Sequence, residues 1–136
     1  MPLVLASAHL GDEEFLEALH SCRLLNSQFH HADHLRLAWL HLHREPLETA
    51  LAKVRAGIQN FAAHHGAAHL YHETITTAWV RLLATHRENS FAEFLRQNET
   101  RLSGGLLHRF WSPEVLAGQA ARATWVPPDL RELPSR

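Results

Sequence analysis

Apolar residues recur every three to four positions along most of this chain, and this spacing is the strongest constraint on its fold. The clearest run lies between residues 47 and 61 and comprises Leu47, Leu51, Val54, Ile58 and Phe61. One face of an α-helix would carry this whole run, because a helix turns about 100° per residue. No run alternates apolar and polar residues in the way that a half-buried strand requires. The sequence therefore predicts an all-α fold.

Capping and breaking residues divide this pattern into five to six helices. The predicted helices span about residues 12–24, 31–44, 46–65, 69 or 72 to 87, 90–97 and 112–122. Asp12, Ser90 and Ser112 are the predicted N-caps, and Glu93 completes a capping box with Ser90. Pro46 is expected to be the first residue of its helix, where proline is well tolerated. These signals predict a helical bundle.

The length of 136 residues suits a single domain, and we expect one helical domain over residues 1–136. Hydrophobic residues make up 46% of the chain and charged residues 20%, which is typical of a globular protein. The last segment, TWVPPDLRELPSR at residues 124–136, contains three prolines and is predicted to be extended. Its apolar side chains, Trp125, Val126 and Leu130, would pack this tail back onto the bundle.

The charge balance and the cysteine content argue against several classes of function. The formal net charge is -1, so neither nucleic acid nor an anionic membrane is expected as a partner. Cys22 is the only cysteine, which excludes an intramolecular disulfide and a multi-cysteine zinc site. GxGxxG and P-loop patterns are absent, so no nucleotide cofactor is expected. The N-terminus does not have a signal-peptide pattern, and a cytoplasmic protein is expected.

Histidine is the unusual component of this chain. There are 13 histidines, as many as lysine and arginine together. Histidine changes charge near neutral pH and is the commonest metal ligand in proteins. On an ideal helix from residue 31, His31 and His34 project onto or beside the face that carries Leu35, Ala38 and Trp39. These two histidines are therefore predicted to point inward.

A second group of histidines stands near the start of the helix predicted to end at residue 87. His72, Thr76 and Trp79 share one stripe there, and His69 and His72 repeat the H-x-x-H spacing of His31 and His34. If the beginnings of these two helices meet, four or five imidazoles and the carboxylate of Glu73 converge. Three histidines, or two with a carboxylate, are enough for a mononuclear metal site with an open position.

The first function hypothesis is a metal-dependent enzyme with hydrolytic or oxidative chemistry. One divalent transition metal, Zn, Fe, Ni or Cu, would be held by the predicted ligands His31, His34, His69 and His72. Glu73 and Thr76 are the predicted catalytic residues, with Glu73 as a base or a further ligand. The predicted lining of the pocket is His65, Tyr71, Trp39 and Trp79.

Two other hypotheses need no metal. The same pocket would serve a binding module for a small polar or anionic molecule. Alternatively, the histidines are incidental and the chain is a helical interaction protein. Leu37 and Leu40 project away from the expected core, so a homodimer through their helix would fit that hypothesis. The sequence HETIT at residues 72–76 is not a zincin motif, because Thr76 stands where the second histidine belongs.

Overall fold

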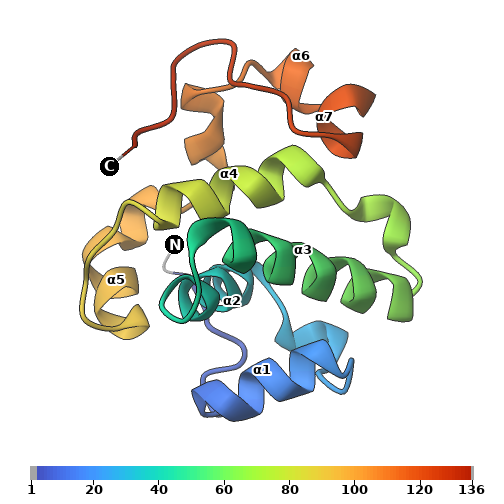
Figure 1. Ribbon diagram of the computed structural model, residues 1–136, viewed down its shortest axis with the longest axis vertical. Coiled ribbons are helices and arrows are strands. Elements are labelled where there is room, and N and C mark those ends of the chain that lie inside the picture. The colour runs from blue at the N-terminus through green and yellow to red at the C-terminus, as the bar shows by residue number, and fades with distance from the viewer. Residues whose placement is uncertain (1–2, 136) are drawn as a thin grey trace. The chain divides into compact units, whose positions relative to one another are not determined.

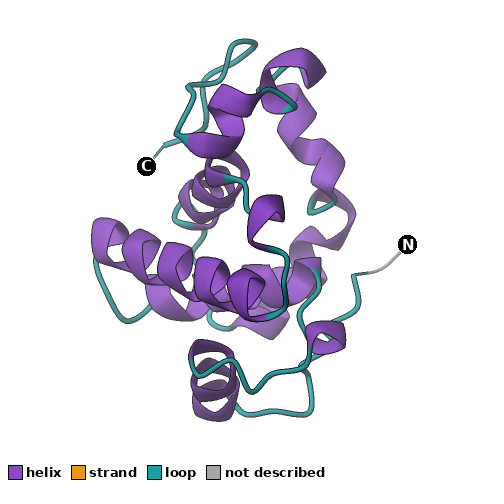
Figure 2. Ribbon diagram, turned by 90° about the vertical axis from the view of Figure 1, so that its right-hand side faces the viewer, coloured by secondary structure: helices purple, strands orange, loops and turns teal. Residues whose placement is uncertain are grey.

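The computed structural model describes residues 3–135, and within this range the chain is helical without a β-strand (Figure 1; Figure 2). The α-helices are α1 (Asp12–His20), α2 (His31–Leu42), α3 (Leu47–His64), α4 (Glu73–Leu83), α5 (Phe91–Asn98), α6 (Pro113–Leu116) and α7 (Gln119–Ala123). Short 3-10 segments lie between them: η1 (Asn26–Gln28), η2 (Ala68–Leu70), η3 (Glu99–Arg101) and η4 (Gly104–Arg109). The predicted all-α class is confirmed.

The described residues fall into two compact units. The N-terminal unit comprises Val4–Tyr71 and holds α1, α2 and α3. The C-terminal unit comprises residues 72–135 with Leu3 and holds α4 to α7. The single domain expected over residues 1–136 stays a prediction, and residues 1, 2 and 136 lie outside the described range.

The core of the N-terminal unit forms around α3, which packs against α1, α2 and η2. Three members of the predicted stripe on α3 are buried, namely Leu51, Val54 and Phe61. From α1, Phe15 and Leu19 are fully buried beside them. The regular spacing of apolar residues thus created the face by which α3 joins the core, since burying that face removes it from water.

A buried carboxylate ties the residues before α1 to the first turn of α2. Asp33 is fully buried and accepts hydrogen bonds from the backbone amides of Ala6 (3.2 Å), Ser7 (2.8 Å) and His30 (3.0 Å). The hydroxyl of Ser7 also donates to Asp33. A buried carboxylate needs several hydrogen-bond donors. Asp33 therefore holds in place the two chain segments that supply them, the residues before α1 and the residue before α2.

Arg36 extends this network one turn further along α2. Its guanidinium donates to the carbonyl oxygens of Ser7 (2.8 Å) and Leu10 (2.7 Å) and to the carboxylate of Asp12 (3.0 Å). The guanidinium carbon also lies 4.6 Å from the centre of the Phe15 ring. Arg36 therefore satisfies the backbone carbonyls that precede α1 and packs against the core of that helix.

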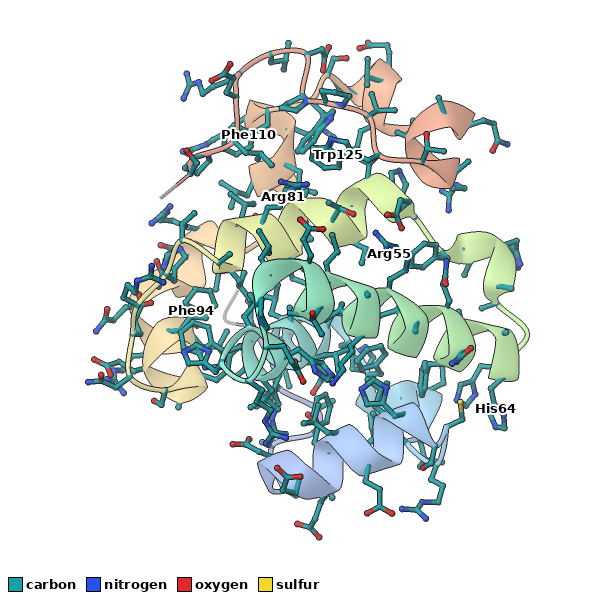
Figure 3. All side chains as sticks on the ribbon, in the orientation of Figure 1. Arg55, His64, Arg81, Phe94, Phe110 and Trp125 are labelled. Carbon is teal, nitrogen blue, oxygen red and sulfur yellow. The ribbon has the colours of Figure 1, made fainter. Side chains whose placement is uncertain are left out.

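The extended tail is tied to the C-terminal unit through its backbone. The Thr74 hydroxyl of α4 donates to the carbonyl of Thr124 (2.8 Å) and accepts from the amide of Val126 (3.0 Å). The indole of the fully buried Trp111 donates to the carbonyl of Val126 (2.8 Å). Figure 3 shows Arg81 beside Trp125, with the guanidinium carbon 5.1 Å from the centre of the indole. The Leu130 side chain remains exposed.

Several predicted helix ends were wrong because local backbone interactions stop the helices earlier. The first helix ends at His20 rather than residue 24, since Cys22 adopts a positive φ of 62°. The helix predicted to reach residue 87 ends at Leu83. The segment predicted as one helix from residue 112 is two short helices, with Gly118 as the N-cap of the second.

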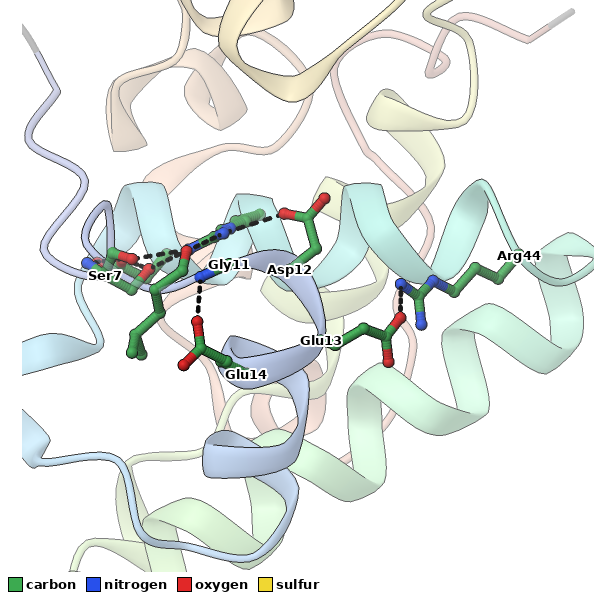
Figure 4. A network of polar contacts seen from close by, with 9 residues as sticks. Ser7, Gly11, Asp12, Glu13, Glu14 and Arg44 are labelled. Atoms are coloured by element: carbon green, nitrogen blue, oxygen red, sulfur yellow. Dashed lines mark hydrogen bonds and ion pairs between the residues drawn. The ribbon is translucent and has the colours of Figure 1, made fainter.

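The N-caps predicted at Ser90 and Ser112 are confirmed, and the one predicted at Asp12 is wrong. Ser90 and Ser112 are N-caps whose hydroxyls accept from the amide three residues later, as predicted. Asp12 is not a cap but the first residue of α1, because Gly11 takes the N-cap position. The Glu14 carboxylate accepts from the Gly11 amide at 3.0 Å (Figure 4).

Both faces of α2 are buried. Leu37 and Leu40, predicted to project away from the core, are 0% and 8% exposed. The exposed leucine pair on which the homodimer hypothesis relied is therefore not present, although self-association itself is untested. Within the described residues, no helix combines the length and apolar character needed to cross a membrane.

Replacing Asp33 with alanine is expected to lower the free energy of unfolding by about 3 kcal/mol, because several donors lose their buried acceptor. The comparison variant is Glu13→Ala, which removes an exposed ion pair with Arg44. This variant should leave the stability nearly unchanged, since exposed pairs contribute little. Urea unfolding followed by circular dichroism measures both effects. Equal stability of the two variants would contradict the role assigned to Asp33.

Replacing Cys22 with glycine is expected to raise the free energy of unfolding by about 0.5 kcal/mol. A left-handed residue with a Cβ costs about 1–2 kcal/mol, and the greater flexibility of unfolded glycine offsets part of the gain. Cys22→Ala is the matched control, because it also removes the thiol contact with the Asn60 carbonyl but keeps the Cβ. Thermal unfolding should place the glycine variant above the alanine variant, and the reverse order would contradict this account.

Candidate functional site

The predicted ligand His34 is engaged in local packing at the start of α2. Its Nδ1–H donates to the carbonyl oxygen of His30 at 2.7 Å, and its ring stacks on Phe29 with the ring centres 3.9 Å apart. Burial lowers the pKa of His34 below its ordinary value of 6.5, although the hydrogen bond to His30 acts in the opposite direction. The lowered pKa favours the neutral imidazole, which packs on the buried Phe29 ring.

His65 belongs to the same aromatic cluster. It is the C-cap of α3, and its ring centre lies 4.4 Å from that of Phe61. Phe61 in turn contacts Phe29 at 4.9 Å, so two phenylalanines separate His65 from His34. The Nε2 atom of His65 is buried without a hydrogen-bond partner among the described residues. The structure thus brings two of the predicted site residues to one cluster, but not into contact.

The remaining predicted residues of the N-terminal unit differ in position and burial. His31 is the first residue of α2 and is half-buried, whereas His69 lies in η2 and is exposed. Tyr71 follows η2 and is half-buried. Trp39 is buried, and its ring centre lies 4.3 Å from that of His43.

His72 uses both ring nitrogens within the C-terminal unit. As the N-cap of α4, it accepts a hydrogen bond from the Ile75 amide through Nδ1 at 3.1 Å. Its Nε2–H donates to the carbonyl oxygen of Leu116 at 2.8 Å. Coordination of a metal by His72 would break one of these bonds, so the geometry assigns it a structural role as a cap.

The two predicted catalytic residues lie in the first turn of α4. The Glu73 carboxylate accepts from the Thr77 hydroxyl at 3.2 Å, one helical turn away. Thr76 is half-buried, and its amide donates to the carbonyl of His72. Trp79, a predicted pocket residue, is 7% exposed and contributes to the buried face of α4.

The predicted metal-ligand set draws on both units, so its convergence stays a prediction. Across residues 3–135, no group of three or more His, Cys, Asp or Glu side chains is placed to hold a metal ion. The engagement of His72 as a cap further weakens that set. A different pair of histidines, both in the N-terminal unit, lies within hydrogen-bonding distance.

This paired-histidine cluster comprises His20, His41, Glu45 and Lys53. The Nε2 atoms of His20 and His41 lie 3.0 Å apart, with the two rings inclined at 71°. The Nδ1 atom of His41 lies 3.1 Å from the Glu45 carboxylate, which also accepts from the Lys53 ammonium at 2.8 Å. His41 is 6% exposed, whereas His20 is exposed. The cluster therefore connects a buried imidazole to the surface.

Hydrogen-bond chemistry specifies the tautomer of His41. An ionised Glu45 can only accept, so the Nδ1 of His41 carries the proton and donates it. The hydrogen bond from Lys53 holds the pKa of Glu45 below its ordinary value, which keeps this carboxylate ionised. In neutral His41, the Nε2 lone pair then faces His20. In the absence of an ion, this lone pair accepts a hydrogen bond from the Nε2–H of His20.

Gly57 of α3 makes room for His20. A Cβ built on Gly57 would lie 2.8 Å from Cε1 of His20 and 3.1 Å from its Nδ1. Glycine inside a helix lowers stability by about 1 kcal/mol relative to alanine. At this position the absence of a side chain leaves room for the His20 imidazole, which an alanine Cβ would contact too closely. α3 therefore supplies the wall against which the His20 ring lies.

The sequence interpretation missed this cluster. On an ideal helix, His20 projects away from the face that carries Phe15 and Leu19, and His41 lies at the margin of the apolar face of its helix, so helical periodicity selects neither as a site residue. Two local signals were available: the i, i+4 spacing of His41 and Glu45, and a glycine in the middle of a strongly helical run. Neither signal indicates that His20 is the partner, because that contact joins two helices.

Comparison of the chain with protein-family models, with curated protein sequences and with solved structures finds no match. The functional argument therefore depends on the geometry of the side chains.

The pKa shifts of His20 and His34 predict a loss of stability in mild acid. Burial lowers both pKa values, so the unfolded chain binds protons more tightly than the folded chain. Their contribution is complete above about pH 6.5 and is lost as the pH falls through the lower, folded values. The free energy of unfolding should therefore decrease from about pH 7 to about pH 5.

The His34→Gln variant should show a shallower decrease over this range, whereas His108→Gln, which alters an exposed histidine, should follow the wild type. Chemical unfolding at a series of pH values measures the slope. Lowered carboxylate pKa values, such as that of Glu45, take effect mainly below about pH 5, at the acidic end of this range, and act equally in the two variants. An unchanged slope in His34→Gln would show that His34 does not contribute.

Proposed function

We propose that the N-terminal unit binds a divalent transition metal ion through the Nε2 atoms of His20 and His41. The observation that supports this proposal is the 3.0 Å separation of these atoms. Two nitrogen ligands at about 2.0–2.1 Å from one metal ion lie about 2.9–3.4 Å apart when the angle between them is 90–110°. The two imidazoles thus approach at a distance suitable for neighbouring ligands of one ion.

Glu45 would orient the ligand His41 without binding the metal ion itself. A carboxylate that accepts from the second nitrogen of a metal-bound histidine orients the ring and raises its basicity. Glu45 stands in this relation to His41, and Lys53 holds Glu45 from the other side. Gly57 provides the space in which the His20 ring reaches the same point.

Imidazole ligands suit Zn²⁺, Ni²⁺ and Cu²⁺, and also iron. With two protein ligands, the other positions would be taken by water, and a bound Zn²⁺ would lower the pKa of such a water toward neutrality and so support hydrolytic chemistry. Because His20 is exposed, a substrate could approach from solvent. The proposal keeps the cytoplasmic location expected from the sequence.

The alternative function is metal-free. Without an ion, the His20 Nε2–H donates to His41, and the cluster is a polar link between α1, α2 and α3. The chain would then be a binding or interaction module, as the other two sequence hypotheses state. The satisfied hydrogen bonds of His41 and Glu45 favour this alternative, and metal titration separates the two.

Titration of tag-free protein with Zn²⁺, followed by isothermal calorimetry, should show about one ion bound per chain. His41→Ala and His20→Ala should each weaken this binding at least tenfold. Glu45→Gln should weaken it by about tenfold, the effect typical of outer-shell carboxylates. His108→Ala, an exposed histidine outside the cluster, is the matched control and should bind like the wild type.

Gly57→Ala gives an independent check because it alters neither histidine. The new Cβ displaces the His20 ring while alanine favours the helix, so zinc binding should weaken without loss of thermal stability. If His20→Ala, His41→Ala and Gly57→Ala all bind zinc like the wild type, the ion binds elsewhere and the proposal is wrong. Absence of zinc binding by the wild type would favour the metal-free alternative.

A further inference from the structure

The C-terminal unit contains a cavity of about 340 Å³ that lies among η3, η4 and the residues between them. It is lined by Thr100, Arg101, Ser103, Gly105, Leu106 and Arg109. A volume of this size is within the range of about 300–1,000 Å³ that is usual for small-molecule sites. It is therefore large enough for more than a single inorganic ion.

The lining of this cavity is suited to an anion. It includes two guanidinium groups and two hydroxyls, and none of the six lining residues is acidic. Among the described residues, Arg109 has neither a hydrogen bond nor an ion pair through its side chain. All of its guanidinium donors are therefore available to a ligand, and paired N–H donors of this kind suit a carboxylate or a phosphate.

Arg101 is held in place by a buried amide. Asn98 is 5% exposed, and its side-chain NH₂ donates to the Glu88 carboxylate (3.1 Å) and to the Phe94 carbonyl (2.9 Å). These two bonds orient Oδ1 of Asn98, which accepts from Nη1 of Arg101 at 3.3 Å. The position of one guanidinium at the cavity is thus specified from the core of the unit. A preorganised cation of this kind loses less entropy when it binds an anion.

We propose that this cavity binds a small organic phosphate, with Arg101 and Arg109 on the phosphate group. Guanidinium groups bind phosphate oxygens through paired N–H donors, and the Ser103 and Thr100 hydroxyls supply further donors. A phosphate dianion has three terminal oxygens for these donors, whereas a carboxylate has two. Leu106 supplies apolar surface for the organic part of the ligand.

A free small molecule suits this site better than a nucleic acid. The chain carries a formal net charge of -1, which does not favour a polyanion with many phosphates. The cations at the cavity are few and belong to one concave site, in contrast to the extended basic surface that tracks a nucleic-acid backbone. This inference is independent of the proposed metal site, because its residues all belong to the other unit.

Titration of the tag-free full chain with phenyl phosphate, followed by isothermal calorimetry and by amide chemical shifts, tests the proposal. Shift changes should centre on residues 100–109. Arg109→Ala and Arg101→Ala should each reduce affinity at least tenfold, and Arg109→Lys should restore part of the loss. Arg87→Ala is the matched control, since Arg87 is an exposed arginine of the same unit outside the cavity, and it should bind like the wild type.

Three comparison ligands test whether the site prefers an organic phosphate over other anions. Phenyl sulfate and benzoate should bind at least tenfold more weakly than phenyl phosphate, because each carries only one negative charge. Inorganic phosphate should bind more weakly as well, because it has no apolar group for Leu106. Equal affinity for all four would indicate an adventitious anion only and would overturn the proposal. Wild-type affinity in both alanine variants, or no binding of phenyl phosphate by the wild type, would also overturn it.

Discussion

The buried carboxylate of Asp33 is the constraint on which the N-terminal unit depends. Its acceptor atoms join the residues before α1 to the first turn of α2, and Arg36, one turn later, satisfies the carbonyls of the same residues. Neither side chain would be tolerated in the interior without these partners, because an unpaired buried charge is strongly destabilising. Together they position α1 across α2 and α3. That placement in turn brings His20, at the end of α1, to His41 of α2.

The histidines of this chain differ in the contacts that their two ring nitrogens make. His72 uses both nitrogens as a helix cap, and His34 donates to the carbonyl one turn before it. His41 instead has a carboxylate behind one nitrogen and another imidazole in front of the other. In neutral His41, this arrangement directs the Nε2 lone pair at the His20 ring. Histidine content and inward direction therefore do not identify a site without the identity of these partners.

The two proposed sites rely on different kinds of preorganisation. At the paired histidines, a carboxylate orients His41, and the missing side chain of Gly57 makes space for His20. At the cavity of the C-terminal unit, the buried amide of Asn98 orients Arg101 from behind. In each case, a polar group that never meets the ligand specifies where the binding group stands. Such supporting residues restrict rotamers and so reduce the entropy lost on binding.

The sequence by itself determined the all-α class, the buried stripe of α3 and the caps at Ser90 and Ser112, because these depend on residues within a few positions of one another. The burial of Leu37 and Leu40 could not be read from local patterns, since it depends on packing against other parts of the chain. The pairing of His20 with His41 was likewise decided only by the tertiary structure. Helical periodicity assigns each side chain to a face of its own helix, but does not specify which face of another helix it meets.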